Sequence, residues 1–140
     1  MKIVVVGSIS FIKQMREARA ELVKLGHEVI LPPSAELNET KEYWAGVKKR
    51  DIQEFFRIGR ERNLKHFDFI KNADAILVIN PPKNGVNGYI GINTIMEMAV
   101  AFEHNKKIFV FNDPSENAFA SEELEYMEPV IINSDLRKIG

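Results

Sequence analysis

Two short stretches of this sequence combine loop-forming residues with groups able to bind or attack a ligand. The first is GSIS, Gly7–Ser10, in which a glycine precedes two hydroxyl side chains. The second is NGYIGINTIME, residues 87–97, a glycine-rich loop that leads into a helical pattern carrying one carboxylate, Glu97. Asn93 precedes Glu97 by about one helical turn. Hydroxyls, backbone N–H groups and a single acid can together form a site for an anionic or sugar-containing ligand.

The place of Glu97 near the start of a helix decides which chemistry suits it. The partial positive charge at a helix N-terminus favours the ionised carboxylate, which can act as a nucleophile or stabilise a developing cation. Acids are also common at helix starts simply because they stabilise helices, and this structural interpretation stands beside the catalytic one. A projection at about 100° per residue predicts that Asn93 and Glu97 border a crevice. The residues that this projection turns toward the sheet are Ile92, Ile95, Met96 and Ala99.

The GSIS stretch predicts a local anion site. It follows a short apolar run and precedes a helical pattern, so its backbone N–H groups and hydroxyls lie at a helix N-terminus. Any turn between a strand and a helix also needs a small residue, which is the purely structural explanation. The Gly-x-Gly-x-x-Gly and Gly-x-x-x-x-Gly-Lys patterns of dinucleotide and triphosphate sites are missing. We therefore expect no cofactor, and phosphate or ribose binding at Gly7, Ser8, Ile9 and Ser10.

Short β-branched runs alternate with helical patterns along the chain. One helical pattern over residues 12–25 ends at Gly26, and another covers residues 91–104. Most of the apolar runs are continuous rather than alternating, as in strands buried on both faces of a parallel sheet. The predicted strands are Ile3–Val6, Val29–Leu31, Ala75–Ile79, Ile108–Phe111 and Val130–Ile132.

This alternation predicts one α/β domain over residues 1–140. The expected architecture is flavodoxin-like or Rossmann-like: a doubly wound, mostly parallel five-stranded sheet of order 2-1-3-4-5. Ligands bind such sheets at the carboxyl ends of the strands, where the strand order reverses. In this order the reversal lies between the first and third strands. Asn80, at the end of the third strand, is therefore a further candidate for ligand binding.

The stretch 36–72 mixes charges of both signs with aromatic and aliphatic residues and is less regular. It predicts one helix, or two helices broken at Gly59. A charged face over an apolar stripe is the simplest explanation of the pattern. The alternative is that Tyr43 and Trp44 form a flap over a ligand.

Composition limits the classes of partner. The chain has 19 basic and 20 acidic residues and a net charge of −1, so no global field favours nucleic acid or anionic membranes. Cysteine is absent, which excludes disulfides, thiol chemistry and cysteine-ligated metal. His27 and His104 lack a second ligand at a suitable spacing, so we expect no metal site. The apolar run in MKIVVVGS is too short for a signal segment, and a cytoplasmic location is expected.

The helix that carries Glu97 resembles the signature helix of the nucleoside 2-deoxyribosyltransferase-like superfamily, which includes the 2′-deoxynucleoside 5′-phosphate N-hydrolases. The resemblance consists of a glycine-containing loop, Thr94, Glu97 three residues later, and Asn105, Lys106 and Lys107 before a strand. It extends to KIVVVGSIS, LVKLGHEVILP and NADAILVIN, and so covers most of the chain.

This resemblance implies cleavage or transfer at the N-glycosidic bond of a (deoxy)nucleoside or nucleoside 5′-monophosphate. In the family the helix glutamate, matched here by Glu97, attacks or stabilises C1′ of the sugar as the base departs. Transfer to another base makes a transferase, and transfer to water makes a hydrolase. The GSIS residues match the sugar- and phosphate-side loop, while Gly91 and Asn93 match the loop before the glutamate. The resemblance also implies a homodimer or larger homo-oligomer in which neighbouring subunits complete each other's sites.

The sequence departs from the phosphate N-hydrolases at two positions. Their acidic residue eight places before the Asp matched by Asp74 is His66 here. We predict that His66 donates a proton or orients water, with a purely packing role as the structural alternative. Their aromatic residue three places before the loop glycine is Val4 here.

Two other functions fit the same residues. One is a non-catalytic nucleotide-binding or sensing module that kept the pocket but lost the acid partner, which the two departures favour. The other is a phosphoribohydrolase of the cytokinin-activating type, whose Gly-Thr-x-x-Glu resembles residues 93–97 although its preceding Pro-Gly-Gly is missing. In each case the expected partner is a small-molecule nucleoside or nucleotide, with no role for nucleic acid or a membrane.

Overall fold

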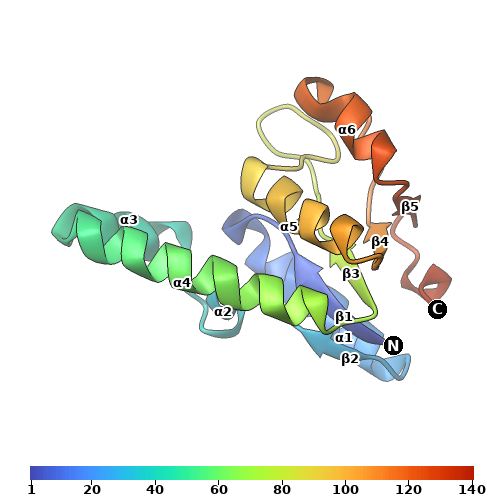
Figure 1. Ribbon diagram of the computed structural model, residues 1–140, viewed down its shortest axis with the longest axis horizontal. Helices are drawn as coiled ribbons and strands as arrows, with labels where there is room; N and C mark the ends of the chain where they lie inside the picture. Colours follow the sequence, from blue (N-terminus) through green and yellow to red (C-terminus); the bar gives the residue numbers. More distant parts are fainter.

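Five short strands form one all-parallel sheet in the computed structural model of the protein, which describes residues 1–140 (Figure 1). The sheet has the order β2-β1-β3-β4-β5, as predicted. Each predicted strand is present with its ends shifted by no more than one residue, because continuous β-branched runs suit strands covered on both faces. The strands are β1 (Lys2–Val6), β2 (Glu28–Ile30), β3 (Ala75–Val78), β4 (Lys107–Val110) and β5 (Val130–Ile131).

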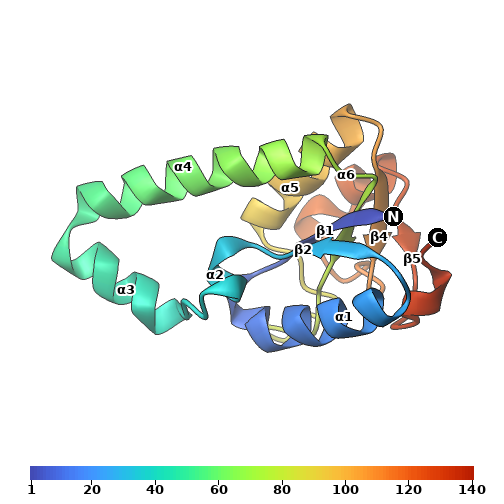
Figure 2. The same ribbon diagram turned by 90° about the horizontal axis from the view of Figure 1, so that it is seen from below.

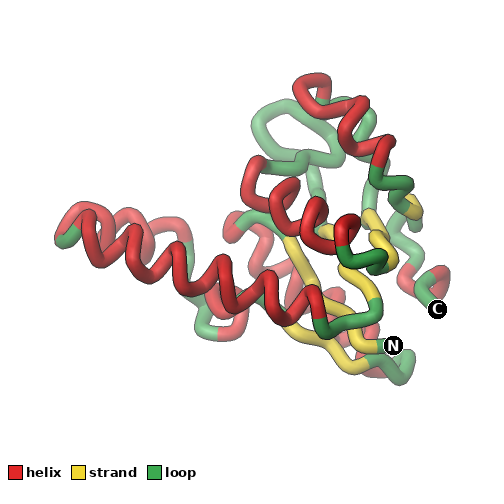
Figure 3. The backbone as a smooth tube through the Cα atoms, viewed as in Figure 1, coloured by secondary structure: helices red, strands yellow, loops and turns green.

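Helices cover both faces of the sheet, with the strands between them (Figure 3). Ile3 and Val5 of β1 join a core layer with α1, while Val4 and Val6 join a second layer with α4, α5 and α6. Successive strand residues point to opposite faces, which is why one strand supplies both layers. None of the helices is both long and apolar enough to cross a membrane. The helices are α1 (Ile12–Lys24), α2 (Pro33–Glu36), α3 (Lys41–Arg50), α4 (Ile52–Lys71), α5 (Ile92–Glu103) and α6 (Ser121–Tyr126).

The predicted break at Gly59 is wrong, because α4 runs without interruption from Ile52 to Lys71. The chain instead turns at Asp51, which ends α3 and whose Oδ1 accepts a hydrogen bond from the Glu54 N–H at 3.1 Å. An aspartate in this N-cap position starts a new helix, whereas a lone glycine is tolerated inside one. The resulting pair of helices, α3 and the first half of α4, extends beyond the sheet as a hairpin arm (Figure 2).

The predicted orientation of α5 is wrong for three of the four residues expected to face the sheet, and only Ile95 packs against the core. Ile92 and Met96, expected to face the sheet, are 68% and 44% exposed, and Ala99 is exposed as well. The residues of this helix are apolar on most of its sides, so the spacing of apolar residues did not identify the buried face. Its packing against β3, β4 and α4 turns a different set inward. The buried residues of α5 are Thr94, Glu97, Met98 and Ala101.

Candidate functional site

A cleft of about 330 Å³ lies at the carboxyl edge of the sheet. Its walls come from the loops that follow β1 and β2, from the α3–α4 arm and from the first turns of α5. This is the edge where doubly wound sheets bind ligands, beside the reversal of strand order between β1 and β3. The lining residues are Gly7, Ile9, Pro32, Ser34, Trp44, Phe55, Gly59, Arg62, Asn63, His66, Asn93 and Glu97.

Gly7 allows the loops after β1 and β3 to approach closely. A Cβ atom at Gly7 would lie 2.8 Å from the carbonyl oxygen of Ile79, so any other residue would push the two loops apart. In the same loop, Ile9 lines the cleft and the Oγ atom of Ser8 accepts a hydrogen bond from Nζ of Lys83. The glycine of the GSIS stretch is therefore required by the packing of the site itself.

Glu97 lies inside the cleft wall and is only 4% exposed. Asn93, one turn earlier on α5, donates from Nδ2 to Oε1 of Glu97 at 3.1 Å. The Oδ1 atom of Asn93 accepts in turn from Nδ2 of Asn63 on α4, also at 3.1 Å. The amides of Asn63 and Asn93 thus connect the two helices and hold the carboxylate in one orientation.

His66 of α4 faces the same carboxylate from the neighbouring helix. Its Nε2 atom lies 2.9 Å from Oε2 of Glu97, but the ring is not aligned for a hydrogen bond. Neither ring nitrogen has a hydrogen-bond partner, although the residue is only 5% exposed. The imidazole therefore packs directly against the carboxylate and helps to fix its position in the cleft wall.

The structure brings five of the predicted site residues together in this cleft and leaves four outside its walls. Gly7, Ile9, His66, Asn93 and Glu97 line it, although they come from segments far apart in the sequence. Beyond the walls, Ser8 and Ser10 lie in the adjoining loop, where the Oγ atom of Ser8 accepts from the Ser10 N–H at 3.2 Å. Gly91 precedes α5 at its N-cap position.

Asn80 is not brought to the cleft. It is fully buried and its side chain joins the loop after β3 to the loop after β4. Its Oδ1 accepts from the Asn112 N–H at 2.9 Å, and its Nδ2 donates to the carbonyls of Asn112 and Gly88 at 2.8 and 3.3 Å. With its amide occupied in this way, Asn80 supports the loops around the site.

Lys83 is a neighbour of the site that the sequence patterns did not indicate. Its Nζ atom donates to Oγ of Ser8 at 3.4 Å and lies over the rings of Phe11 and Tyr89. It belongs to none of the ion pairs of the protein. The Asn84-Gly85 pair, where both residues have positive φ, is a sequence signal for a tight turn. Such a turn folds the chain back sharply beside Lys83 and could have indicated that Lys83 lies near the site.

The arm supplies the aromatic end of the cleft. Trp44 lines it, whereas Tyr43 is 47% exposed and does not. The indole is fixed by its N–H, which donates to Oγ of Ser34 at 3.0 Å, and by an edge contact with Phe55. The guanidinium of Arg62 lies 5.0 Å from the centre of the Trp44 ring and is paired with Glu39. The cleft therefore has a polar inner end at Glu97 and an aromatic outer end.

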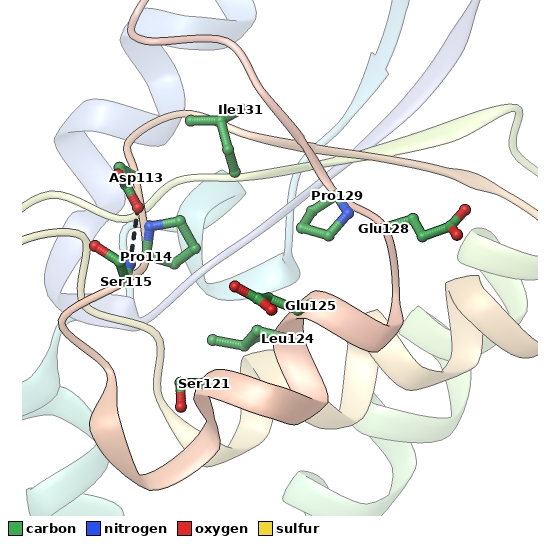
Figure 4. Close-up of a pocket in the computed structure, with 9 residues that line it drawn as sticks. All are labelled: Asp113, Pro114, Ser115, Ser121, Leu124, Glu125, Glu128, Pro129 and Ile131. Carbon is green, nitrogen blue, oxygen red and sulfur yellow. Dashed lines mark hydrogen bonds between the residues drawn. The ribbon is translucent and has the colours of Figure 1, made fainter.

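A second cavity, of about 360 Å³, lies between α6 and the loop after β4 (Figure 4). It contains none of the predicted site residues. Three acids line it, Asp113, Glu125 and Glu128, and one of them, Asp113, accepts from the Ser115 N–H at 2.9 Å. Because like charges repel, this cavity does not suit an anionic nucleotide. The cleft at Glu97 is the better candidate site.

Comparison with known proteins does not name a family for this chain: no family model matches the sequence, and no curated protein matches it either.

Proposed function

We propose that the protein cleaves or transfers at the N-glycosidic bond of a (deoxy)nucleoside or nucleoside 5′-monophosphate. The single observation that carries the proposal is the meeting of Glu97 and His66 in a cleft shared with the loop after β1. A buried carboxylate held by Asn93, in contact with the ring of His66, is suited to stabilise positive charge while a base departs. The resemblance of the Glu97 helix to the deoxyribosyltransferase-like superfamily supports the same chemistry.

In this mechanism the C1′–N bond breaks while positive charge develops on the sugar ring. Glu97 lies beside C1′ and stabilises the charge, either through space or by forming a transient bond. The departing base leaves with the bonding electrons, and His66 supplies the proton that neutralises it. A new C1′ bond then forms to the oxygen of water or to the nitrogen of an acceptor base, while any bond to Glu97 breaks. The proton that this nucleophile loses returns to His66.

The proposal is tested by incubating the protein with deoxy- and ribonucleosides and their 5′-monophosphates, with and without an acceptor base. Chromatography of the products detects free or exchanged base. Base release or exchange by the protein is the expected result. Binding of a nucleotide in the cleft without any turnover would instead favour the non-catalytic binding module.

Lys83 supports 5′-monophosphates over nucleosides as substrates. Its unpaired ammonium group and the Ser8 hydroxyl can together hold a phosphate next to the cleft. We expect Lys83→Met to lower kcat/KM for a 5′-monophosphate by roughly 10- to 100-fold, the loss of one charge-assisted hydrogen bond. Turnover of the corresponding nucleoside should change by less than about threefold, because it carries no phosphate.

Lys13→Met is the matched control for Lys83→Met, since Lys13 is an exposed lysine on the first turn of α1. It removes the same charge without touching the loop beside Ser8. An equal loss for both substrates in Lys83→Met, or an equal effect of both variants, would contradict a phosphate contact by Lys83.

A homo-oligomer is part of the same proposal. The outward face of α5 carries Ile92, Met96 and Phe102, of which Phe102 is 50% exposed, and such faces mark interaction surfaces. We expect a wild-type dimer of twice 16.0 kDa and a 16.0 kDa monomer for Met96→Glu, measured by light scattering. Phe119→Glu, at an exposed aromatic residue outside α5, should leave the dimer intact. A monomeric wild type, or a dimer unchanged by Met96→Glu, would overturn this part.

A further inference from the structure

Gly59 lies in the interior of α4 without any packing reason to be glycine. It is nearly midway along a helix of 20 residues, and glycine is the least favourable residue in a helix interior apart from proline. Its backbone is ordinary helix, so no positive φ requires it. A Cβ atom added to it would meet nothing within 4 Å. Folding alone would therefore favour alanine at this position.

The side of Gly59 that lacks a side chain faces the cleft. Phe55, Gly59 and Asn63 follow one another at intervals of four along α4 and so lie on one face of the helix, and all three line the cleft. Toward Phe55 and Trp44 the wall is aromatic. Toward Asn63 and His66 it is polar and leads to Glu97. Gly59 separates these two ends and leaves open space between them.

We propose that the gap at Gly59 admits the second ring of a purine, which makes the protein selective for purine over pyrimidine bases. This inference rests on the proposed function, because it places the sugar at Glu97 and the base toward Trp44. A planar base gains contact with the indole and phenyl rings at the outer end of the cleft. A side chain at Gly59 occupies the space that the larger base needs, whereas a single-ring base reaches less far.

Two substitutions at Gly59 separate stability from recognition. Gly59→Ala should raise Tm by about 3 °C, since alanine is the better helix former. Gly59→Leu is also a good helix former, but its side chain fills the gap. We expect Gly59→Leu to weaken binding of 2′-deoxyadenosine 5′-monophosphate by at least about tenfold. Binding of 2′-deoxycytidine 5′-monophosphate should change by less than about threefold.

Trp44 provides a direct readout, because it is the single tryptophan of the chain and lines the cleft. Its fluorescence is titrated with each of the two nucleotides in the Glu97→Gln background, so that no turnover interferes. Gly46→Ala is the matched control, since Gly46 lies inside α3 and outside the cleft, and a Cβ there makes only an ordinary contact of 3.5 Å with Arg50. Gly46→Ala should raise Tm without changing either affinity.

Failure of this inference and failure of the proposed function are distinguishable. If Gly59→Leu weakens the binding of both nucleotides equally, or weakens neither, the purine gap is overturned even if the wild-type protein releases base. If Gly59→Leu selectively weakens binding of the purine nucleotide but the wild-type protein never releases base, the gap is supported and the glycosidase is overturned.

Discussion

Replacing Glu97 by glutamine lowers the rate of base release on the order of 10³-fold, equivalent to about 4 kcal/mol of transition-state stabilisation. Glutamine keeps the length and shape of the side chain, and its oxygen can still accept from Nδ2 of Asn93. What it loses is the negative charge beside C1′, which matters only when positive charge develops on the sugar. We therefore expect the loss in kcat, with KM changed by less than about threefold.

The control for this prediction is Glu103→Gln, at an exposed acid in the last turn of the same helix. It removes one negative charge from α5 outside the cleft walls and should leave kcat unchanged. Circular dichroism and thermal unfolding of both variants establish that the fold persists. Substantial base release by a folded Glu97→Gln protein would show that the carboxylate does not stabilise the transition state.

Replacing His66 by glutamine lowers kcat by about 10²-fold with a natural purine nucleotide, the usual contribution of a general acid. The expectation follows from its position: the ring lies in the cleft wall, and its Nε2 atom is 2.9 Å from Oε2 of Glu97. Glutamine can hydrogen-bond but cannot deliver a proton to the departing base. Binding in the Trp44 titration should remain within about threefold of the wild type.

A substrate with a leaving group that needs no proton tests this role directly. A nitrophenyl 2-deoxyribofuranoside 5′-phosphate releases nitrophenolate as an anion, so the variant should turn it over nearly as fast as the wild type. His104→Gln, at an exposed histidine whose Nδ1 contacts the Val100 carbonyl, is the control and should affect neither substrate. An equal loss on both substrates in His66→Gln would assign His66 a structural role instead of proton transfer.

The strand arrangement of this protein could be predicted because each strand is a continuous apolar run, with apolar side chains on both faces of the sheet. The core of β1, Val4, Val5 and Val6, is fully buried on both sides. The parallel order then follows from the alternation with helices and from the handedness of their connections. The α3–α4 boundary was not predicted, because a glycine such as Gly59 is the more familiar helix breaker, whereas here the side chain of Asp51 makes the cap.

The candidate site could be predicted in part. Glu97 and the Gly7 loop were identified from their place after β3 and β1, and the structure puts Glu97 and Gly7 in one cleft. The projection of α5 was wrong for Ile92 and Met96, which are exposed, whereas Glu97 is buried and lines the cleft. The pattern of apolar residues does not indicate that α5 buries a carboxylate. The amide of Asn93 that holds Glu97 is itself held by Asn63 on another helix, a contact that only the folded structure provides.

The remaining features of the site depend on tertiary packing that no local pattern contains. The approach of His66 to Glu97 requires α4 and α5 to lie side by side, as they do in Figure 1. Lys83 reaches Ser8 across 75 residues of sequence. Asn80 was predicted to bind a ligand because it lies at a strand end. In the structure its side chain is buried and its hydrogen bonds join two loops.

The most direct test of the central claim is a crystal structure of the Glu97→Gln protein with bound 2′-deoxyadenosine 5′-monophosphate, in which the substrate stays intact. We predict that C1′ of the sugar lies about 3–3.5 Å from the substituted side chain at position 97, the separation expected of a reactive arrangement. The base should extend toward Trp44 and the phosphate toward Ser8. A nucleotide bound elsewhere, or one whose C1′ atom lies well outside contact with the side chain at that position, would contradict the claim that this cleft presents an acid to a glycosidic bond.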